Sequence, residues 1–360
     1  MRRQVASRRG SGPPKVAFVY PNPRGELAAR VAAGEAPDST LLGQNHLAAF
    51  GIDARLHDPV LTRRGGGRLR WNLRELTLPW ELGDADVAFT PLASLFPLVA
   101  RVRRRPRVVV VNFGLCTIWD RSSSARRALL GASLRSAATV VCLGEWQRRR
   151  LEEQTGARAT TALLGIDERY FSPRPAPPQA EPCVLAVGKD VARDYATFAE
   201  AVRRLGVRAE IAAYPRNLEG VRLPAGTRAR AVGPAELREL YAGAACVVVP
   251  QRRQAYPYGS EGGGLTALLE TLAMGRPLVA SDRPILHDYV AHEETALLVP
   301  PEEPDALAAA IARVLDDAEL VRRLGEAGRA RVEADLTTRH FAERIAPILL
   351  AARSIRSSGY

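Results

Sequence analysis

A run of glycines in front of an apolar helical pattern is the segment of this sequence best suited to holding an anion. It extends from Gly259 to Gly264, and the helical pattern behind it carries Glu270. Serial glycines let backbone N–H groups approach a ligand, and the start of a helix adds partial positive charge. Glu270 lies about two turns into this helix, where its carboxylate can accept hydrogen bonds from vicinal hydroxyls. The predicted ligand-binding residues are Gly262, Gly263, Gly264, Leu265, Thr266 and Glu270.

Two basic residues occupy an equivalent place earlier in the chain. Gly188 and Lys189 directly follow a strand-like run, and Arg193 precedes a helical pattern. Positive side chains at the end of a parallel strand can neutralise a departing phosphate group. We therefore predict that Lys189 and Arg193 form a functional basic pair that faces the expected cleft. The structural alternatives are a pair of exposed bases and a glycine-rich surface turn.

The elements that must position these residues alternate between β-rich apolar runs and helical patterns. One alternating series spans residues 15–171 and a second spans residues 183–335, with a proline-rich linker at residues 172–182. This order predicts an α/β protein with two Rossmann-like, doubly wound parallel sheets, whose ligands bind in a cleft at the carboxyl ends of the strands. Helices are expected over residues 41–50 and 91–104, and a mobile loop over residues 60–80.

The glycine-rich segment and its helix resemble a motif of the retaining glycosyltransferase family four, which has the GT-B fold. The matching positions in the second part of the motif are Glu270, Gly275, Pro277, Val279 and Ser281. In that family seven residues separate the motif's two glutamates, whereas eight separate Glu261 from Glu270 here. Either the turn bulges by one residue, or Glu261 does not take the usual place beside the donor sugar.

The resemblance implies transfer of a sugar from a nucleotide-sugar donor, for example a UDP-, GDP- or ADP-sugar, to a hydroxyl acceptor with retention of configuration. It implies Lys189, Arg193 and Glu261 as the catalytic residues, with Lys189 and Arg193 clamping the donor diphosphate. It also implies Gly188 among the donor-binding residues, and neither a metal ion nor a cofactor. It also implies that residues 336–360 form a helix that returns to the first lobe. The alternative is a catalytically silent GT-B accessory or nucleotide-binding protein.

The acceptor side carries fewer signals. Where the family often has a histidine, this sequence offers Asn112, Thr117 and Asp120 as candidates. His46 falls on the apolar face of a helical pattern, so we expect it in the core. The four cysteines are widely spaced, which predicts neither disulfides nor a metal site.

Composition and charge narrow the classes of protein. A net charge of +12 carried almost entirely by arginine fits either solvated helix faces or a basic face that meets an anionic membrane or acceptor. No nucleic-acid-binding module is recognisable, so nucleic acid is not an expected partner. Residues 1–14 form a basic arm, expected to be disordered, without the apolar stretch of a secretory signal, and no run is long enough to span a membrane. We expect a cytoplasmic protein, with peripheral contact at the inner membrane face as a further expectation.

Overall fold

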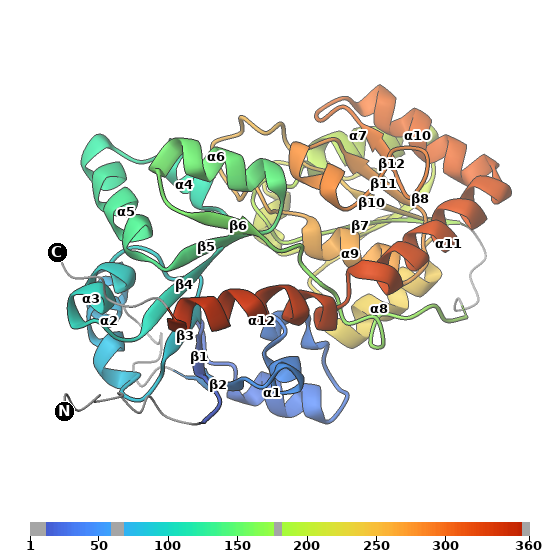
Figure 1. Cartoon of the computed structure of the whole chain (residues 1–360). Helices are drawn as coiled ribbons and strands as arrows, with labels where there is room; N and C mark the ends of the chain where they lie inside the picture. Colours follow the sequence, from blue (N-terminus) through green and yellow to red (C-terminus); the bar gives the residue numbers. More distant parts are fainter. Residues whose placement is uncertain (1–11, 59–67, 176–181, 355–360) are drawn as a thin grey trace, which may run out of the picture.

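The computed structural model describes residues 12–58, 68–175 and 182–354, which form two α/β lobes (Figure 1). Each lobe contains a six-stranded sheet in which neighbouring strands pair in parallel, with strand orders β2-β1-β3-β4-β5-β6 and β12-β11-β10-β7-β8-β9. The predicted fold class is confirmed. The strands of the first sheet are β1 (Lys15–Val19), β2 (Asp53–His57), β3 (Val87–Thr90), β4 (Arg107–Asn112), β5 (Thr139–Cys142) and β6 (Ala159–Thr161). Those of the second are β7 (Cys183–Val187), β8 (Arg208–Ala212), β9 (Thr227–Arg230), β10 (Cys246–Val249), β11 (Leu278–Ser281) and β12 (Leu297–Val299).

Helices cover both faces of each sheet. Those of the first lobe are α1 (Gly25–Ala32), η1 (Asp38–Leu41), η2 (Gln44–Phe50), α2 (Arg68–Glu81), α3 (Phe96–Arg103), α4 (Leu115–Asp120), α5 (Ser124–Ser136) and α6 (Glu145–Thr155). Those that follow are α7 (Tyr195–Leu205), η3 (Pro215–Leu218), α8 (Pro234–Gly243), α9 (Leu265–Ala273), η4 (Pro284–Asp288), α10 (Pro304–Asp316), α11 (Ala318–Asp335) and α12 (Thr338–Ser354). No helix in the described parts of the chain is both long and apolar enough to cross a membrane.

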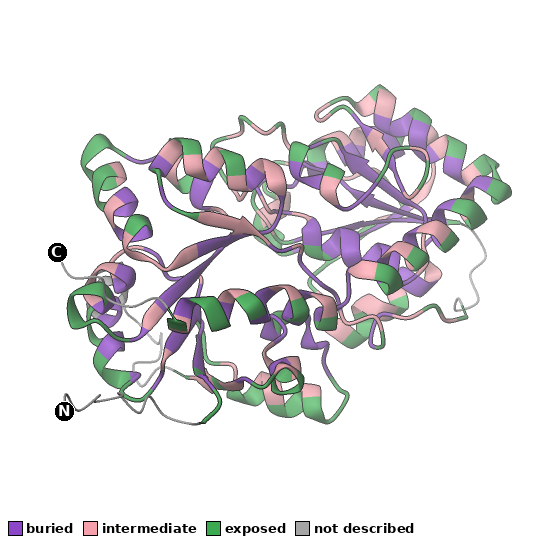
Figure 2. Ribbon diagram, in the orientation of Figure 1, coloured by how far each residue is buried: buried purple, intermediate pink, exposed green. Residues whose placement is uncertain are grey.

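The two lobes share one apolar core. A single cluster of buried side chains includes Phe18 and Phe89 of the first sheet, Leu268 of α9 and Phe341 of α12. Figure 2 shows this buried interior continuing between the lobes. Helix α12 leaves the second lobe and packs on η2, β3 and β4, so the end of the chain ties the lobes together.

The lobes are also joined where the chain crosses between them. The backbone N–H of Ile166 donates to Leu336, and the N–H of Thr338 donates to Ile166. A Cβ atom on the neighbouring Gly165 would lie 2.1 Å from the carbonyl oxygen of Thr337, so only glycine fits this crossing.

Three predicted elements differ from the structure. Residues 41–50 form 3-10 turns instead of one helix, because Leu42 and Gly43 have left-handed backbone angles. Residues 68–80 belong to α2 and are not a loop, while residues 59–67 lie outside the described residues. Helix α3 begins at residue 96 and not at residue 91. At its start, Glu75 of α2 accepts hydrogen bonds from the N–H groups of residues 95 and 96.

Candidate functional site

The residues predicted to clamp a diphosphate gather where β7 and β10 end. Gly188 follows β7 with a φ of 144°, and the guanidinium of Arg193 lies against it. A Cβ atom at Gly188 would lie 1.8 Å from Arg193 Nε. Gly264, which precedes α9, has a φ of 100°, and its Cβ would lie 3.0 Å from Arg193 Nη1. The guanidinium is therefore enclosed by two glycines, neither of which can be replaced without strain.

Arg193 is only 6% exposed, yet its Nε and Nη1 atoms have no hydrogen-bond partner. The amide oxygen of Gln251, beside the same glycine, is also buried without a partner. A buried guanidinium left unpaired is costly, and an anionic ligand removes that cost by accepting its hydrogen bonds. The arrangement is that of an anion site in which the ligand completes the pairing.

Lys189 is the exposed member of the basic pair. Its ammonium lies 4.8 Å from the centre of the Tyr214 ring, which holds it by a cation–π contact at the end of β8. The positive charges of Lys189 and Arg193 both act to lower the pKa of Glu270. The structure thus brings three predicted site residues, from two separate segments, into one electrostatic neighbourhood.

Glu270 lies in the interior of α9. Burial raises the pKa of its carboxyl to about 7, against the opposing influence of a hydrogen bond from Tyr241 and of the two positive charges. The hydroxyl of Tyr241, itself fully buried, donates to Glu270 Oε2 at 2.8 Å. One oxygen is therefore held in place, and the group is poised to change its charge near neutral pH.

The glycine-rich turn is shaped by two side chains that the sequence did not single out. Gln251 donates to the carbonyl of Gly263 at 2.6 Å, and Asp190 accepts from the hydroxyl of Ser260 at 3.2 Å. A Cβ at Gly259 would lie 2.4 Å from Asp190 Oδ1, so the carboxylate occupies the space that a larger residue would need. Gln251 lies two residues after the end of β10, and that position near a strand end was the available signal.

The remaining members of the segment differ in exposure. Leu265 is buried in the shared core, whereas Thr266 is exposed on the first turn of α9. The N–H of Gly262 donates to the carbonyl of Phe113 in the first lobe at 3.4 Å. The turn therefore faces the first lobe directly.

Glu261, predicted as a catalytic residue, extends its side chain to the first lobe. It is fully buried, and its carboxylate accepts four hydrogen bonds, from Cys116 N, Thr117 N, Thr117 Oγ1 and Gln147 Nε2. These partners belong to α4 and α6 of the first lobe, and the two N–H groups are those of the first turn of α4. A carboxylate at a helix N-terminus is stabilising. Of the two alternatives for the longer spacing, the geometry favours the one in which Glu261 leaves the usual place and joins the lobes.

The three acceptor-side candidates are likewise engaged within the protein. Asn112 is fully buried and accepts from the N–H of Leu115 at 2.7 Å, which orders the start of α4. Thr117 binds Glu261, and Asp120 pairs with Arg150 at 2.9 Å on the surface. Thr117 therefore takes part in the contact between the lobes, whereas Asn112 is occupied within the first lobe.

Side chains that could bind a metal ion are spread apart in the described part of the chain. Within residues 12–58, 68–175 and 182–354, no group of three or more His, Cys, Asp or Glu side chains is arranged to hold a metal ion. The four cysteines are buried free thiols. His46, expected in the core, instead lies half-buried beside Asp38 at 2.8 Å, while His287 is exposed.

Part of the candidate site lies in a region that matches a known protein family. Residues 230–331 match the family model described as Glycosyl transferases group 1, and this range contains the glycine-rich turn and Glu270. An exopolysaccharide phosphotransferase of Streptomyces coelicolor is 34% identical over 120 residues, which cover 31% of this chain and 12% of that protein. A glycogen synthase of Mycobacterium tuberculosis is 37% identical over 90 residues, which cover 25% of this chain and 22% of that protein. The chain thus spans less than a quarter of the length of these relatives.

Solved structures match over nearly the whole chain. A sucrose-phosphate synthase of Thermosynechococcus elongatus superposes with a TM-score of 0.73 at 20% identity, covering 94% of this chain and 100% of the other. HepE of Anabaena, in complex with UDP-glucose, superposes with a TM-score of 0.70 at 12% identity, covering 94% and 99%. The protein therefore has the GT-B fold, and its second lobe contains a region that matches the group 1 glycosyl transferases.

Proposed function

We propose that this protein transfers a glycosyl group from a nucleoside diphosphate sugar to a hydroxyl acceptor. The observation that carries the proposal is the buried guanidinium of Arg193 between Gly188 and Gly264, in which Nε and Nη1 have no hydrogen-bond partner. A diphosphate supplies the acceptors that this guanidinium lacks, and Lys189 adds a second positive charge from the open side. The match of residues 230–331 to group 1 glycosyl transferases supports the same reaction class.

The ribose of the donor is assigned to Glu270. Its carboxylate has one oxygen held by Tyr241, which leaves the other to accept hydrogen bonds from vicinal hydroxyls. Since the structural neighbour HepE was solved with UDP-glucose, a UDP-sugar is the first donor to try, followed by GDP- and ADP-sugars. The preference among uracil, guanine and adenine as the base of the donor is to be measured.

The proposed reaction retains configuration without a nucleophile from the protein. The bond from the anomeric carbon to the diphosphate oxygen breaks, while the acceptor oxygen bonds to that carbon on the same face. The proton of the acceptor hydroxyl passes to the departing phosphate oxygen. Lys189 and Arg193 stabilise the charge that develops on the diphosphate, which is why we propose that no metal ion is needed. Glu261 takes no part in this scheme, because its carboxylate is occupied by α4 and Gln147.

A basic face on the first lobe suggests where the acceptor is met. Helix α3 exposes Arg101, Val102 and Arg103, and Arg104 follows it. The neighbouring Trp80 is 59% exposed and lies under the guanidinium of Arg103 at 4.6 Å. Exposed arginines with an aromatic and an aliphatic side chain suit an anionic lipid surface, so we propose peripheral contact with such a membrane through this face.

The proposed function is tested by thermal shift and by turnover. Purified protein is screened against UDP, GDP, ADP, TDP and CMP, with and without EDTA, because a ligand that binds only the folded state raises the melting temperature. We expect one diphosphate to give a selective shift that EDTA does not remove, and Lys189→Ala to diminish it. No shift with any nucleotide would contradict the proposal.

A catalytically silent GT-B protein is the second candidate. The observation that favours it is the engagement of Glu261 and Thr117 in the contact between the lobes, with Asn112 occupied by the N–H of Leu115 within the first lobe. Such a protein would still bind the diphosphate. Release of nucleoside diphosphate from the matching nucleotide sugar separates the two, since only an active transferase releases it above the uncatalysed rate.

A further inference from the structure

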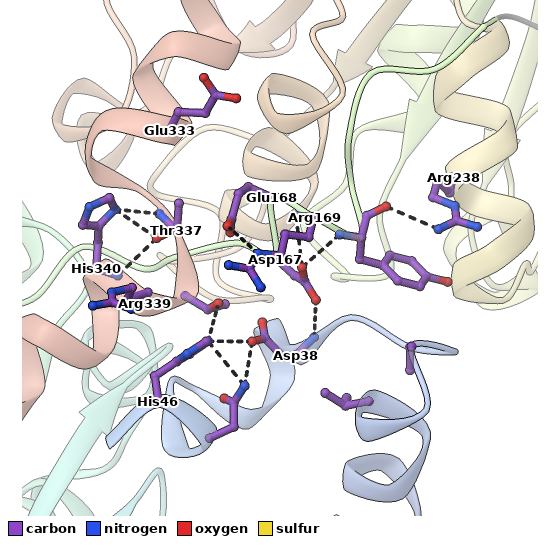
Figure 3. Close-up of a pocket in the computed structure, with 16 residues that line it drawn as sticks. Asp38, His46, Asp167, Glu168, Arg169, Arg238, Glu333, Thr337, Arg339 and His340 are labelled. Carbon is purple, nitrogen blue, oxygen red and sulfur yellow. Dashed lines mark hydrogen bonds and ion pairs between the residues drawn. The ribbon is translucent and has the colours of Figure 1, made fainter. Parts of the chain in front are cut away.

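A pocket of about 740 Å³ lies away from the residues assigned to the donor. Its walls come from α1, η1 and η2 of the first lobe, from residues 167–170, from α8, and from the junction of α11 and α12 (Figure 3). Neither Lys189, Arg193, Glu270 nor the glycine-rich turn lines it. The pocket is large enough for a small organic ligand and is lined by parts of both lobes.

Two buried oxygen atoms in this pocket have no hydrogen-bond partner. One is the hydroxyl of Tyr170, a residue that is 7% exposed, and the other is Oδ1 of Asp38, whose side chain is 9% exposed. Buried polar atoms of native proteins are nearly always paired, so each unpaired one calls for a partner that binds from outside. Both belong to residues that line the same pocket.

The positions of these two residues are fixed by one carboxylate. Oδ2 of Asp167 accepts from the N–H of Asp38 at 2.9 Å, and Oδ1 accepts from the N–H of Tyr170 at 2.9 Å. His46 and Asn45 both contact Oδ2 of Asp38 at 2.8 Å, which leaves Oδ1 as the unpaired oxygen. Figure 3 shows Asp38, His46 and Asp167 converging on the centre of the pocket. The site is therefore built before any ligand arrives.

The charges of the lining select the class of ligand. Burial alone would raise the pKa of Asp38, but hydrogen bonds with His46 and Asn45 bring that pKa below its ordinary value, so the carboxylate is ionised at neutral pH. Across the pocket, Arg238 of α8 lies 4.5 Å over the Tyr170 ring, and its Nε is unpartnered. The lining carries both signs of charge, since it contains four carboxylates and three guanidinium groups, and neither a phosphate nor an ammonium meets charge of one sign there. These residues are Asp38, Asp167, Glu168, Glu333, Arg169, Arg238 and Arg339. Sugar hydroxyls donate to carboxylates and accept from guanidinium groups.

We propose that this pocket is a second carbohydrate site, which binds a neutral saccharide through Asp38, Tyr170 and Arg238. The inference does not depend on the reaction proposed above, since it concerns residues outside the donor site. Because Asp38 belongs to the first lobe and Arg238 to the second, a bound saccharide contacts both lobes.

Calorimetric titration of the full chain with glucose, maltose and sucrose, in the absence of nucleotide, tests the proposal. We expect at least one of these neutral sugars to bind saturably, and glucose 6-phosphate to bind more weakly than glucose. Tyr170→Phe removes an atom with no partner in the protein, so the variant should fold with an unchanged or higher melting temperature. Its affinity for the saccharide should fall about fivefold, and that of Asp38→Asn about tenfold.

Tyr195→Phe is the matched control, because Tyr195 is buried, lies outside the pocket, and donates to the carbonyl of Gly188 at 2.7 Å. It should leave saccharide affinity unchanged. The proposal is overturned if none of the neutral sugars binds, if the phosphorylated sugar binds more tightly, or if Tyr170→Phe binds the saccharide as well as the unaltered protein. If a nucleoside diphosphate raises the melting temperature but no saccharide binds, the second carbohydrate site is refuted and the proposed donor site is not.

Discussion

Replacing Glu270 by glutamine is the perturbation whose effect can be worked out most fully. Burial raises the pKa of Glu270 to about 7 from an ordinary value of 4.5. The folded protein therefore binds a proton more tightly than the unfolded chain does, and its stability falls as pH rises from 4.5 to 7. The difference between the two pKa values corresponds to about 3 kcal/mol at pH 8.

Glutamine cannot ionise and keeps an oxygen to accept from Tyr241. We expect Glu270→Gln to lose most of this pH dependence, so that its free energy of unfolding exceeds that of the unaltered protein by about 3 kcal/mol at pH 8 and matches it near pH 4.5. Urea denaturation at several pH values measures the difference. Glu239→Gln, on the exposed surface of α8, is the control and should show no such divergence. Parallel pH profiles for the unaltered protein and Glu270→Gln would refute the reasoning.

The other expected outcomes concern the anion site, the turn, the lobe contact and the basic face. Arg193→Met should raise the melting temperature of the unliganded protein, because an unpaired buried cation is removed, while abolishing the nucleoside diphosphate shift. Gly264→Ala, at a φ of 100° and against Gln251, should cost about 1–3 kcal/mol of stability in urea denaturation. Glu261→Gln should lower the melting temperature through loss of about 1–3 kcal/mol between the lobes, yet leave the diphosphate shift in place. Sedimentation with anionic vesicles should carry the protein down, and Arg103→Glu should weaken this.

Specific results would contradict three of these outcomes, those for Arg193→Met, Glu261→Gln and the vesicles. A diphosphate shift that survives in Arg193→Met would remove the guanidinium from the binding site. Loss of the shift in Glu261→Gln, at a temperature where the variant is folded, would return Glu261 to the donor site. Equal sedimentation with neutral and anionic vesicles would exclude an electrostatic contact with lipid.

The fold was predictable because its strands are short apolar runs between clear helical patterns. The alternation restarts after the linker at residues 172–182, and the two sheets follow from that order. The 3-10 turns near Leu42 were not predictable, since a left-handed backbone at a leucine leaves no mark in the apolar pattern. Helix α2 was missed because the nearby glycines suggested a loop, whereas Glu75 and Leu78 are buried against the lobe.

The candidate site was only partly predictable. Lys189, Arg193 and Glu270 stand at strand ends or in a helix with a recognisable pattern, and the structure brings them together. The task of Glu261 depends on Thr117, 144 residues away, which no local pattern reports. The pocket around Asp38 and Tyr170 was not predictable either. Its residues come from separate segments of the chain, and Asp167 holds both of them by hydrogen bonds.

Calorimetric titration of UDP into the unaltered protein and into Arg193→Met, both in EDTA, tests whether the Arg193 guanidinium binds the diphosphate of a nucleotide-sugar donor. If the buried guanidinium is the anion site of a nucleotide-sugar donor, the unaltered protein binds UDP without a metal ion and the variant does not. If GDP or ADP binds in place of UDP, the donor has a different base, but the role of Arg193 as the anion site is unchanged. Equal binding by the two proteins, or no binding of any of the three diphosphates by the unaltered protein, would contradict it.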